Sequence, residues 1–247
     1  MIRTLFNKSA LLPVVAAAAI TFISPNVAAQ PELDTAFMNV FPGTSTDCLG
    51  YCFGSGWGID DVKATVAVNT VTLQPNFNTY EDNVGDPYWR DNGGAGPGGN
   101  KVMEANLYYE QLVPARATTM EFNGSVDAHT LDAGYTVEAY VTVAPGAAPL
   151  AADTDAIIAT DTGFTVSMDV SGFVGETIQA GLRITGINAN PADEVALGSV
   201  VTTIAQLEVG QTPIPPAPAV TPVPALPLWG LFALISLMGY MGFRRKM

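Results

Sequence analysis

The chain has 247 residues, with 23 acidic and ten basic residues and a formal net charge of −13. A negative charge of this size repels phosphate backbones, so nucleic acid is excluded as a favoured partner. One histidine and two cysteines leave few residues for zinc binding or for a Ser-His-Asp or Cys-His mechanism.

Residues 1–29 have the three parts of a cleaved export signal. Arg3 and Lys8 form a basic start, residues 11–23 are apolar, and small residues at 27–29 suit a signal peptidase. We therefore expect residues 1–29 to be a signal peptide and exclude them from the fold.

Residues 30–211 are predicted to form one domain, because this length is enough for a sizeable core. The segment holds all 23 acidic residues and five of the basic ones, which leaves a net charge of −18. Most of these carboxylates are expected to form a solvated acidic surface. Such a surface suits neutral glycans and divalent cations more than anionic partners.

The two cysteines, Cys48 and Cys52, are close in sequence, and in an oxidising compartment such a pair most simply forms a disulfide. A redox motif would normally have two intervening residues instead of three. A metal site would need more thiol or imidazole ligands, and His129 is the chain's only histidine. A strand-end histidine with no nucleophile motif nearby is expected to be non-catalytic.

Aromatic residues beside polar ones are the candidates for ligand binding, since an aromatic face covers the apolar side of a sugar while carboxylates and amides bond its hydroxyls. The predicted ligand-binding residues are Trp57 and the run Tyr88, Trp89, Arg90, Asp91 and Asn92. The alternative is that Trp57 and Trp89 close the open ends of the fold.

Alternation of apolar and polar residues predicts β-strands through most of the domain. The alternating runs lie at 64–68, 71–73, 103–109, 120–126, 135–143, 164–170 and 178–184, with a final strand at 200–207. The phase slips by one near Asn69, which predicts a bulge or turn there. Many short strands between turn residues favour an all-β, two-sheet antiparallel β-sandwich of jelly-roll type, with an immunoglobulin-like sandwich as the alternative.

In overall pattern, residues 85–207 resemble bacterial jelly-roll carbohydrate-binding modules. The likeness rests on residues 88–92, the run 100–105, the strand pair 118–143 and residues 178–191. It implies a non-catalytic domain that binds carbohydrate, with a structural calcium held by loop carboxylates and carbonyls.

The C-terminal region reads as a linker followed by a membrane span. Residues 212–227 are rich in proline, and residues 228–247 are apolar up to a basic end at Arg244, Arg245 and Lys246. The apolar run is just long enough to cross a bilayer, and its basic end is expected to stay in the cytoplasm.

This tail resembles the sorting signals of the PEP-CTERM class, in a variant with a Pro-containing motif that ends in Trp-Gly. The motif residues are Val223, Pro224, Pro227, Trp229 and Gly230, although a literal Pro-Glu-Pro is absent. The resemblance implies recognition and removal of the tail by an exosortase, a membrane protease. Without processing, the tail is a plain membrane anchor.

Together these observations predict an exported cell-surface or extracellular-matrix protein that is not an enzyme and binds a surface polysaccharide. One alternative is a structural or adhesion protein whose acidic faces bind calcium. A weaker alternative is a small glycoside hydrolase, which needs only two carboxylates.

Overall fold

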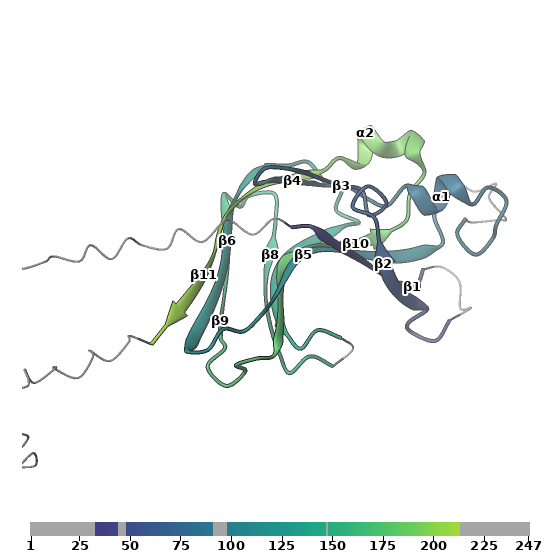
Figure 1. The fold of residues 1–247 in the computed structure, drawn as a ribbon. Coiled ribbons are helices and arrows are strands. Elements are labelled where there is room, and N and C mark those ends of the chain that lie inside the picture. The colour runs from purple at the N-terminus through teal and green to yellow at the C-terminus, as the bar shows by residue number, and fades with distance from the viewer. Residues whose placement is uncertain (1–32, 44–47, 91–97, 147, 213–247) are drawn as a thin grey trace, which may run out of the picture.

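The computed structural model describes residues 33–43, 48–90, 98–146 and 148–212, which form two antiparallel β-sheets packed face to face (Figure 1). The predicted signal peptide, the predicted membrane span and sorting motif, and Asp91 and Asn92 lie outside these ranges. Within the described ranges, no helix has the length and apolar character needed to cross a membrane.

The first sheet has six strands in the order β2-β1-β5-β10-β7-β8. The strand bounds are β1 Thr35–Pro42, β2 Phe53–Trp57, β5 Lys101–Leu112, β7 Thr136–Val143, β8 Ala151–Ile157 and β10 Thr177–Ile187. Every neighbouring pair in this sheet is antiparallel.

The second sheet has five strands in the order β3-β4-β11-β6-β9. Its bounds are β3 Ala64–Ala67, β4 Thr70–Leu73, β6 Ala117–His129, β9 Gly163–Asp169 and β11 Val200–Gln211. The short helices α1 (Asn78–Asp82), η2 (Pro191–Asp193) and α2 (Glu194–Leu197) complete the described elements, and α1 and α2 lie at the same end of the sandwich in Figure 1.

The core forms where the inward faces of the two sheets meet. Strand β9 alternates without a break, with Phe164, Val166 and Met168 buried between exposed neighbours. On the opposite sheet, Ile178, Ala180, Leu182 and Ile184 of β10 are buried in the same way. Two sheets with one apolar face each must bury those faces against each other, so the period-two pattern leads directly to a sandwich.

The predicted two-sheet antiparallel β-sandwich is confirmed. The phase slip near Asn69 is a turn between β3 and β4, in which Val68 adopts a left-handed conformation at φ 59°. The final strand continues beyond the predicted end at 207 to Gln211. Strands β1, β2 and β8 were not predicted.

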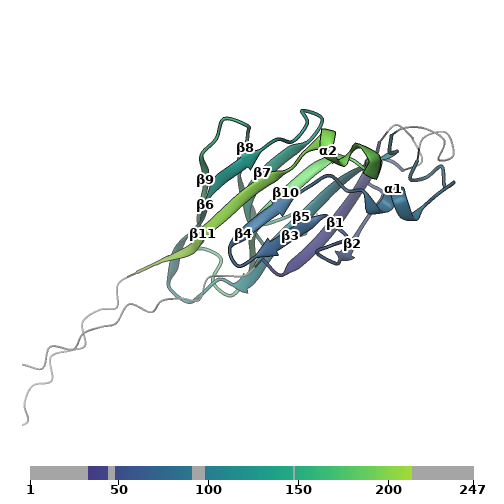
Figure 2. The same ribbon diagram turned by 90° about the horizontal axis from the view of Figure 1, so that it is seen from above.

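The chain crosses repeatedly between the sheets. From β4 to β11 it changes sheet at each step except from β7 to β8, which pair as neighbours. Figure 2 shows the resulting layers from above. As a consequence, β5, β10 and β7 lie side by side in the first sheet although they come from distant parts of the sequence.

Candidate functional site

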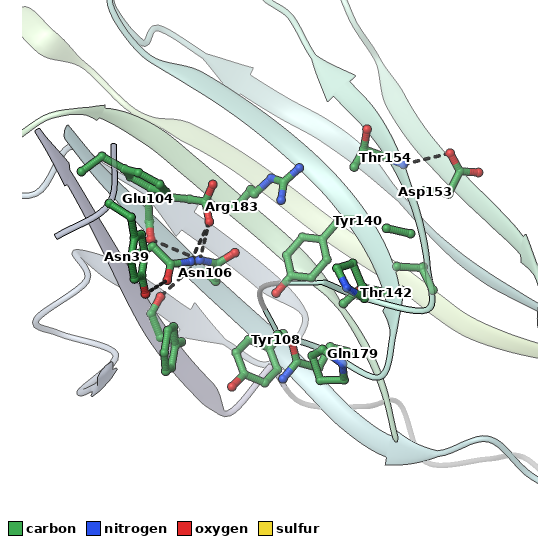
Figure 3. A pocket seen from close by; sticks show the side chains of 18 residues that line it. Asn39, Glu104, Asn106, Tyr108, Tyr140, Thr142, Asp153, Thr154, Gln179 and Arg183 are labelled. Carbon is green, nitrogen blue, oxygen red and sulfur yellow. Dashed lines mark hydrogen bonds between the residues drawn. The ribbon is translucent and has the colours of Figure 1, made fainter. Parts of the chain in front are cut away.

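A cleft of about 660 Å³ lies on the outer face of the six-stranded sheet (Figure 3). Its lining comes from β1, β5, β10, β7 and β8, together with Tyr51 and the connection after β7. Residues that alternate with the core positions of the same strands form its floor. The sandwich core thus fixes the backbone beneath the cleft.

Two tyrosines form the centre of the cleft. Tyr108 on β5 and Tyr140 on β7 are both in register with Gly181 on β10, the strand between them. Because Gly181 has no side chain, nothing rises from the middle strand between the two rings. A β-carbon at Gly181 would collide with the Leu107 carbonyl and lie only 2.7 Å from the Tyr108 β-carbon.

Both tyrosine hydroxyls keep their protons at neutral pH. Burial raises the pKa of Tyr140 above that of an ordinary tyrosine. Burial also raises the pKa of Tyr108, and the nearby Glu110 carboxylate adds to that rise. Neutral phenols can both donate and accept hydrogen bonds.

A chain of polar side chains crosses from the edge of the cleft to its floor. The Tyr51 hydroxyl donates to Oδ1 of Asn39 at 3.1 Å, and Nδ2 of Asn39 donates to Oε1 of Glu104 at 2.9 Å. The same Oε1 accepts a second bond from Nδ2 of Asn106 at 3.3 Å. Two amides therefore hold the Glu104 carboxylate in one orientation beside the tyrosines, as Figure 3 shows for Asn39, Glu104 and Asn106.

The positive charge in the cleft is neutralised locally. Arg183 forms an ion pair with Glu138, with its Nη2 at 2.6 Å from Oε2. Its guanidinium carbon also lies 5.5 Å from the centre of the Tyr140 ring. Glu104 adds a further carboxylate, which gives the cleft a negative balance. Asp153, by contrast, is in register with a core residue of β7 and points to the other side of edge strand β8.

The aromatic residues predicted to bind a ligand, Trp57, Tyr88 and Trp89, do not line this cleft. Trp89 packs against the core, with its ring edge-on to Phe53 at 6.2 Å and to Tyr88 at 4.9 Å. Trp57 also packs against the core, and its indole N–H donates to Ser55 Oγ at 2.7 Å. This packing matches the alternative in which both tryptophans close the sandwich. A ligand site at these residues stays a prediction.

Arg90 is buried, and its guanidinium stabilises the surrounding loop. Its guanidinium lies 4.0 Å from the centre of the Tyr80 ring, and it donates to the carbonyls of Tyr80 and Glu81. Asn188 fastens the same region, because its Oδ1 accepts from the backbone N–H of Asn100 and its Nδ2 donates to the Trp89 carbonyl. These bonds hold the Tyr88–Arg90 segment against the sandwich.

The predicted disulfide between Cys48 and Cys52 is present, with the two Cα atoms 5.2 Å apart. It closes a small loop just before β2. Tyr51, inside this loop, reaches the edge of the cleft.

Within the described part of the chain, no group of three or more His, Cys, Asp or Glu side chains could hold a metal ion. The structural calcium implied by the resemblance stays a prediction. His129 ends β6 and is half-buried, with Nε2 at 3.3 Å from the Ile157 carbonyl. It takes no part in the cleft lining.

The cleft residues were not predicted, because they stand at the outward positions of their strands. Those strands were predicted from the apolar residues at their inward positions. Two signals could have identified them. The outward side of residues 104–110 carries Glu104, Asn106 and Tyr108, where a plain solvent face would have small polar or charged residues. The outward side of β10 carries Gly181, and a glycine inside a strand often marks a close approach.

No family model and no curated protein matches the sequence. Among solved structures, the carbohydrate-binding module TmCBM61 in complex with β-1,4-galactotriose matches with 9% identity and a TM-score of 0.29, over 62% of this chain and 77% of that one. A CBM4 structure matches with 11% identity and a TM-score of 0.31, over 60% and 75% of the two chains. A mutant of xylanase 10C from Cellvibrio japonicus, in complex with xylopentaose, matches with 12% identity and a TM-score of 0.32, over 74% and 28%. At these scores the likeness gives no ground for assigning a ligand.

Proposed function

We propose that this protein is an exported, non-catalytic carbohydrate-binding protein of the cell surface or extracellular matrix, and that the cleft on the six-stranded sheet binds a neutral glycan. The observation that carries the proposal is the pair Tyr108 and Tyr140, with Glu104, Asn39 and Asn106 beside them. Aromatic faces with a few convergent polar groups are the arrangement that sugar recognition requires.

The charge of the cleft supports a neutral ligand. Arg183 is already paired with Glu138, while Glu104 contributes negative charge. A uronic acid or a sulfated sugar would bring further negative charge to this carboxylate, and like charges repel. A neutral polysaccharide meets no such barrier.

The spacing of the carboxylates supports binding without catalysis. Glu104 is on β5 and Asp153 is on β8, with β10 and β7 between them, and the Asp153 side chain stands on the opposite side of the sheet from Glu104. At ~4.8 Å per strand this is about 14 Å between strand axes. A glycosidase places its two carboxyl groups ~5 to 9.5 Å apart around the scissile bond. The alternative of a small glycoside hydrolase is therefore less favoured.

The location is proposed from the two ends of the sequence. Residues 1–29 direct export, and the tail at 212–247 either anchors the protein in the membrane or is removed by an exosortase-like protease. A calcium-binding structural or adhesion role is the second candidate, and the acidic balance of the domain favours it.

The proposal is tested by measuring affinity for a panel of neutral polysaccharides with the parent protein, Tyr108→Ala and Tyr109→Ala. These consecutive tyrosines on β5 face opposite ways, since Tyr108 lines the cleft while Tyr109 packs against the core. Because Tyr108 is itself buried, both variants should lose stability; we expect the folded fraction of Tyr108→Ala to lose most binding and the folded fraction of Tyr109→Ala to bind normally.

Three controls separate the alternatives. Binding that disappears with chelator would favour the calcium-dependent adhesion role. Release of reducing sugar from the polysaccharides would identify a hydrolase. A parent protein that binds no member of the panel would refute the carbohydrate-binding proposal.

A further inference from the structure

We infer that Tyr51, presented by the loop that the Cys48–Cys52 disulfide closes, is a wall of the cleft and contacts the bound glycan. This inference rests on the proposed carbohydrate binding. Tyr51 lies in the cleft lining although it belongs to no strand, and half of its surface is exposed.

Two contacts, and the space left by a glycine, fix the side chain of Tyr51 at the edge of the sheet. Its hydroxyl donates to Oδ1 of Asn39, and its ring lies edge-on to Phe41 with the centroids 5.5 Å apart and an interplanar angle of 69°. Gly54 on β2 supplies the space. A β-carbon at Gly54 would run into the Tyr51 hydroxyl and lie 2.7 Å from Oδ1 of Asn39.

The loop itself has little packing to hold it. Leu49 is fully exposed, and Gly50 is in a left-handed conformation at φ 78°. The backbone N–H of Cys52 donates to the Val40 carbonyl at 2.8 Å, which ties one end of the loop to β1. The disulfide ties Cys48 to this fixed end. Without the cross-link, ordering Tyr51 on binding would cost conformational entropy that the closed loop has already lost.

The position of Tyr51 fits contact with a sugar. Phe37, Phe41 and Tyr51 form an aromatic group at the β1 side of the cleft, and Tyr108 and Tyr140 form another on β5 and β7. Asn39 stands between Phe37 and Phe41 on β1, opposite Glu104, and Asn106 stands between Glu104 and Tyr108 on β5. Tyr108 is one strand spacing from β1, ~5 Å, and Tyr140 is three, ~14 Å, which exceeds the length of one sugar ring. A ligand that reaches from Tyr51 to Tyr140 is therefore an oligosaccharide.

The test uses four proteins: the parent, Tyr51→Ala, Cys48→Ser/Cys52→Ser, and the variant that combines all three changes. Calorimetry measures their affinity for cello-, xylo-, galacto- and manno-oligosaccharides of two to six residues. For the longest oligosaccharide that the parent binds, we expect Tyr51→Ala to weaken binding about tenfold and the serine variant about threefold to fivefold. The combined variant should be no weaker than Tyr51→Ala, because the disulfide acts through Tyr51.

A matched control is Leu49→Ala, which changes an exposed residue of the same loop and should leave affinity within twofold of the parent. Unchanged affinity in Tyr51→Ala would overturn the inference. So would losses that multiply in the combined variant, because the disulfide and the tyrosine would then act independently. If the parent binds none of the oligosaccharides, the proposed function fails and the ligand contact of Tyr51 fails with it.

A second measurement needs no glycan. NMR contacts between the rings of Tyr51 and Phe41 should be present in the parent and lost in the serine variant. Contacts that persist without the disulfide would show that the cross-link does not hold the ring, whatever the binding data give.

Discussion

Replacing Glu104 by glutamine should weaken glycan binding without changing the fold. The two hydrogen bonds that Asn39 and Asn106 donate to Oε1, at 2.9 and 3.3 Å, can also be accepted by the amide oxygen of a glutamine. The substitution removes the negative charge and turns the second oxygen into a donor. A sugar hydroxyl that donated to the carboxylate must instead accept a bond from the glutamine amide, so a neutral hydrogen bond replaces a charged one.

The expected loss follows from the strength of such bonds. A hydrogen bond to a charged group is worth about 1.5–3 kcal/mol, against about 0.5–1.5 kcal/mol for a neutral pair. The difference of about 1–1.5 kcal/mol predicts a fivefold to tenfold weaker affinity, on the order that calorimetry resolves.

Glu104→Ala should behave differently, because it also removes the acceptor for Asn39. A part-buried amide left without a partner costs about 1–3 kcal/mol, so this variant should both bind weakly and unfold at lower temperature. Glu208→Gln is the control, since Glu208 is an exposed carboxylate on β11 of the opposite sheet. Unchanged affinity in Glu104→Gln, with an unchanged melting temperature, would refute the role of this carboxylate.

Four further predictions concern other parts of the chain. Trp89→Ala should lower the free energy of unfolding by about 3 kcal/mol or more in calorimetry, because the ring packs on Phe53 and the core. An unchanged melting temperature combined with lost glycan binding would instead favour a sugar platform at Trp89. Burial raises the pKa of Tyr135 to about 12, so the folded state holds this proton more tightly than the unfolded chain does, and stability should fall as the pH rises from 10.0 to about 12. Tyr135→Phe should reduce that loss of stability when the free energy of unfolding is measured in urea across this pH range. If the variant and the parent have the same pH dependence, Tyr135 is not the group responsible. Mass spectrometry of the surface form should find no peptide that contains Arg244–Lys246 in a host with the processing protease, and recovery of the intact tail would mean a plain anchor. At low salt, uronic-acid polysaccharides should bind more weakly than neutral ones of the same linkage, with the gap closing as salt increases; equal affinities at low salt would contradict the charge argument.

The core strands could be predicted from the sequence because their two faces differ. On β9, the buried Phe164 and Val166 alternate with exposed residues, and this contrast is local information. Strand β1 has a weaker contrast, since Phe37 and Phe41 place two aromatic rings on its outer face. Strand β8 lacks it for the opposite reason, because Asp153 and Asp155 stand on its core side between Ala151 and Ile157.

The cleft could not be predicted, because it depends on which strands become neighbours. Tyr108 and Tyr140 meet only because β10 inserts between β5 and β7 and places Gly181 between the rings. Periodicity along one strand carries no information on such pairing. Trp89 shows the same limit, since nothing near it in sequence indicates that Phe53 and Asn188 will hold it.

The separation of the cleft and the chain's exit onto different sheets has a mechanical consequence. The described chain leaves the domain through β11, which pairs with β4 on one side and with β6 along most of its length on the other. A pull on the residues that follow Gln211 therefore loads β11 along its axis, and many hydrogen bonds must shear together before it slides. The cleft lies on the outer face of the other sheet, with the apolar core between it and β11. A domain held from that end is expected to sustain tension while the cleft keeps its shape.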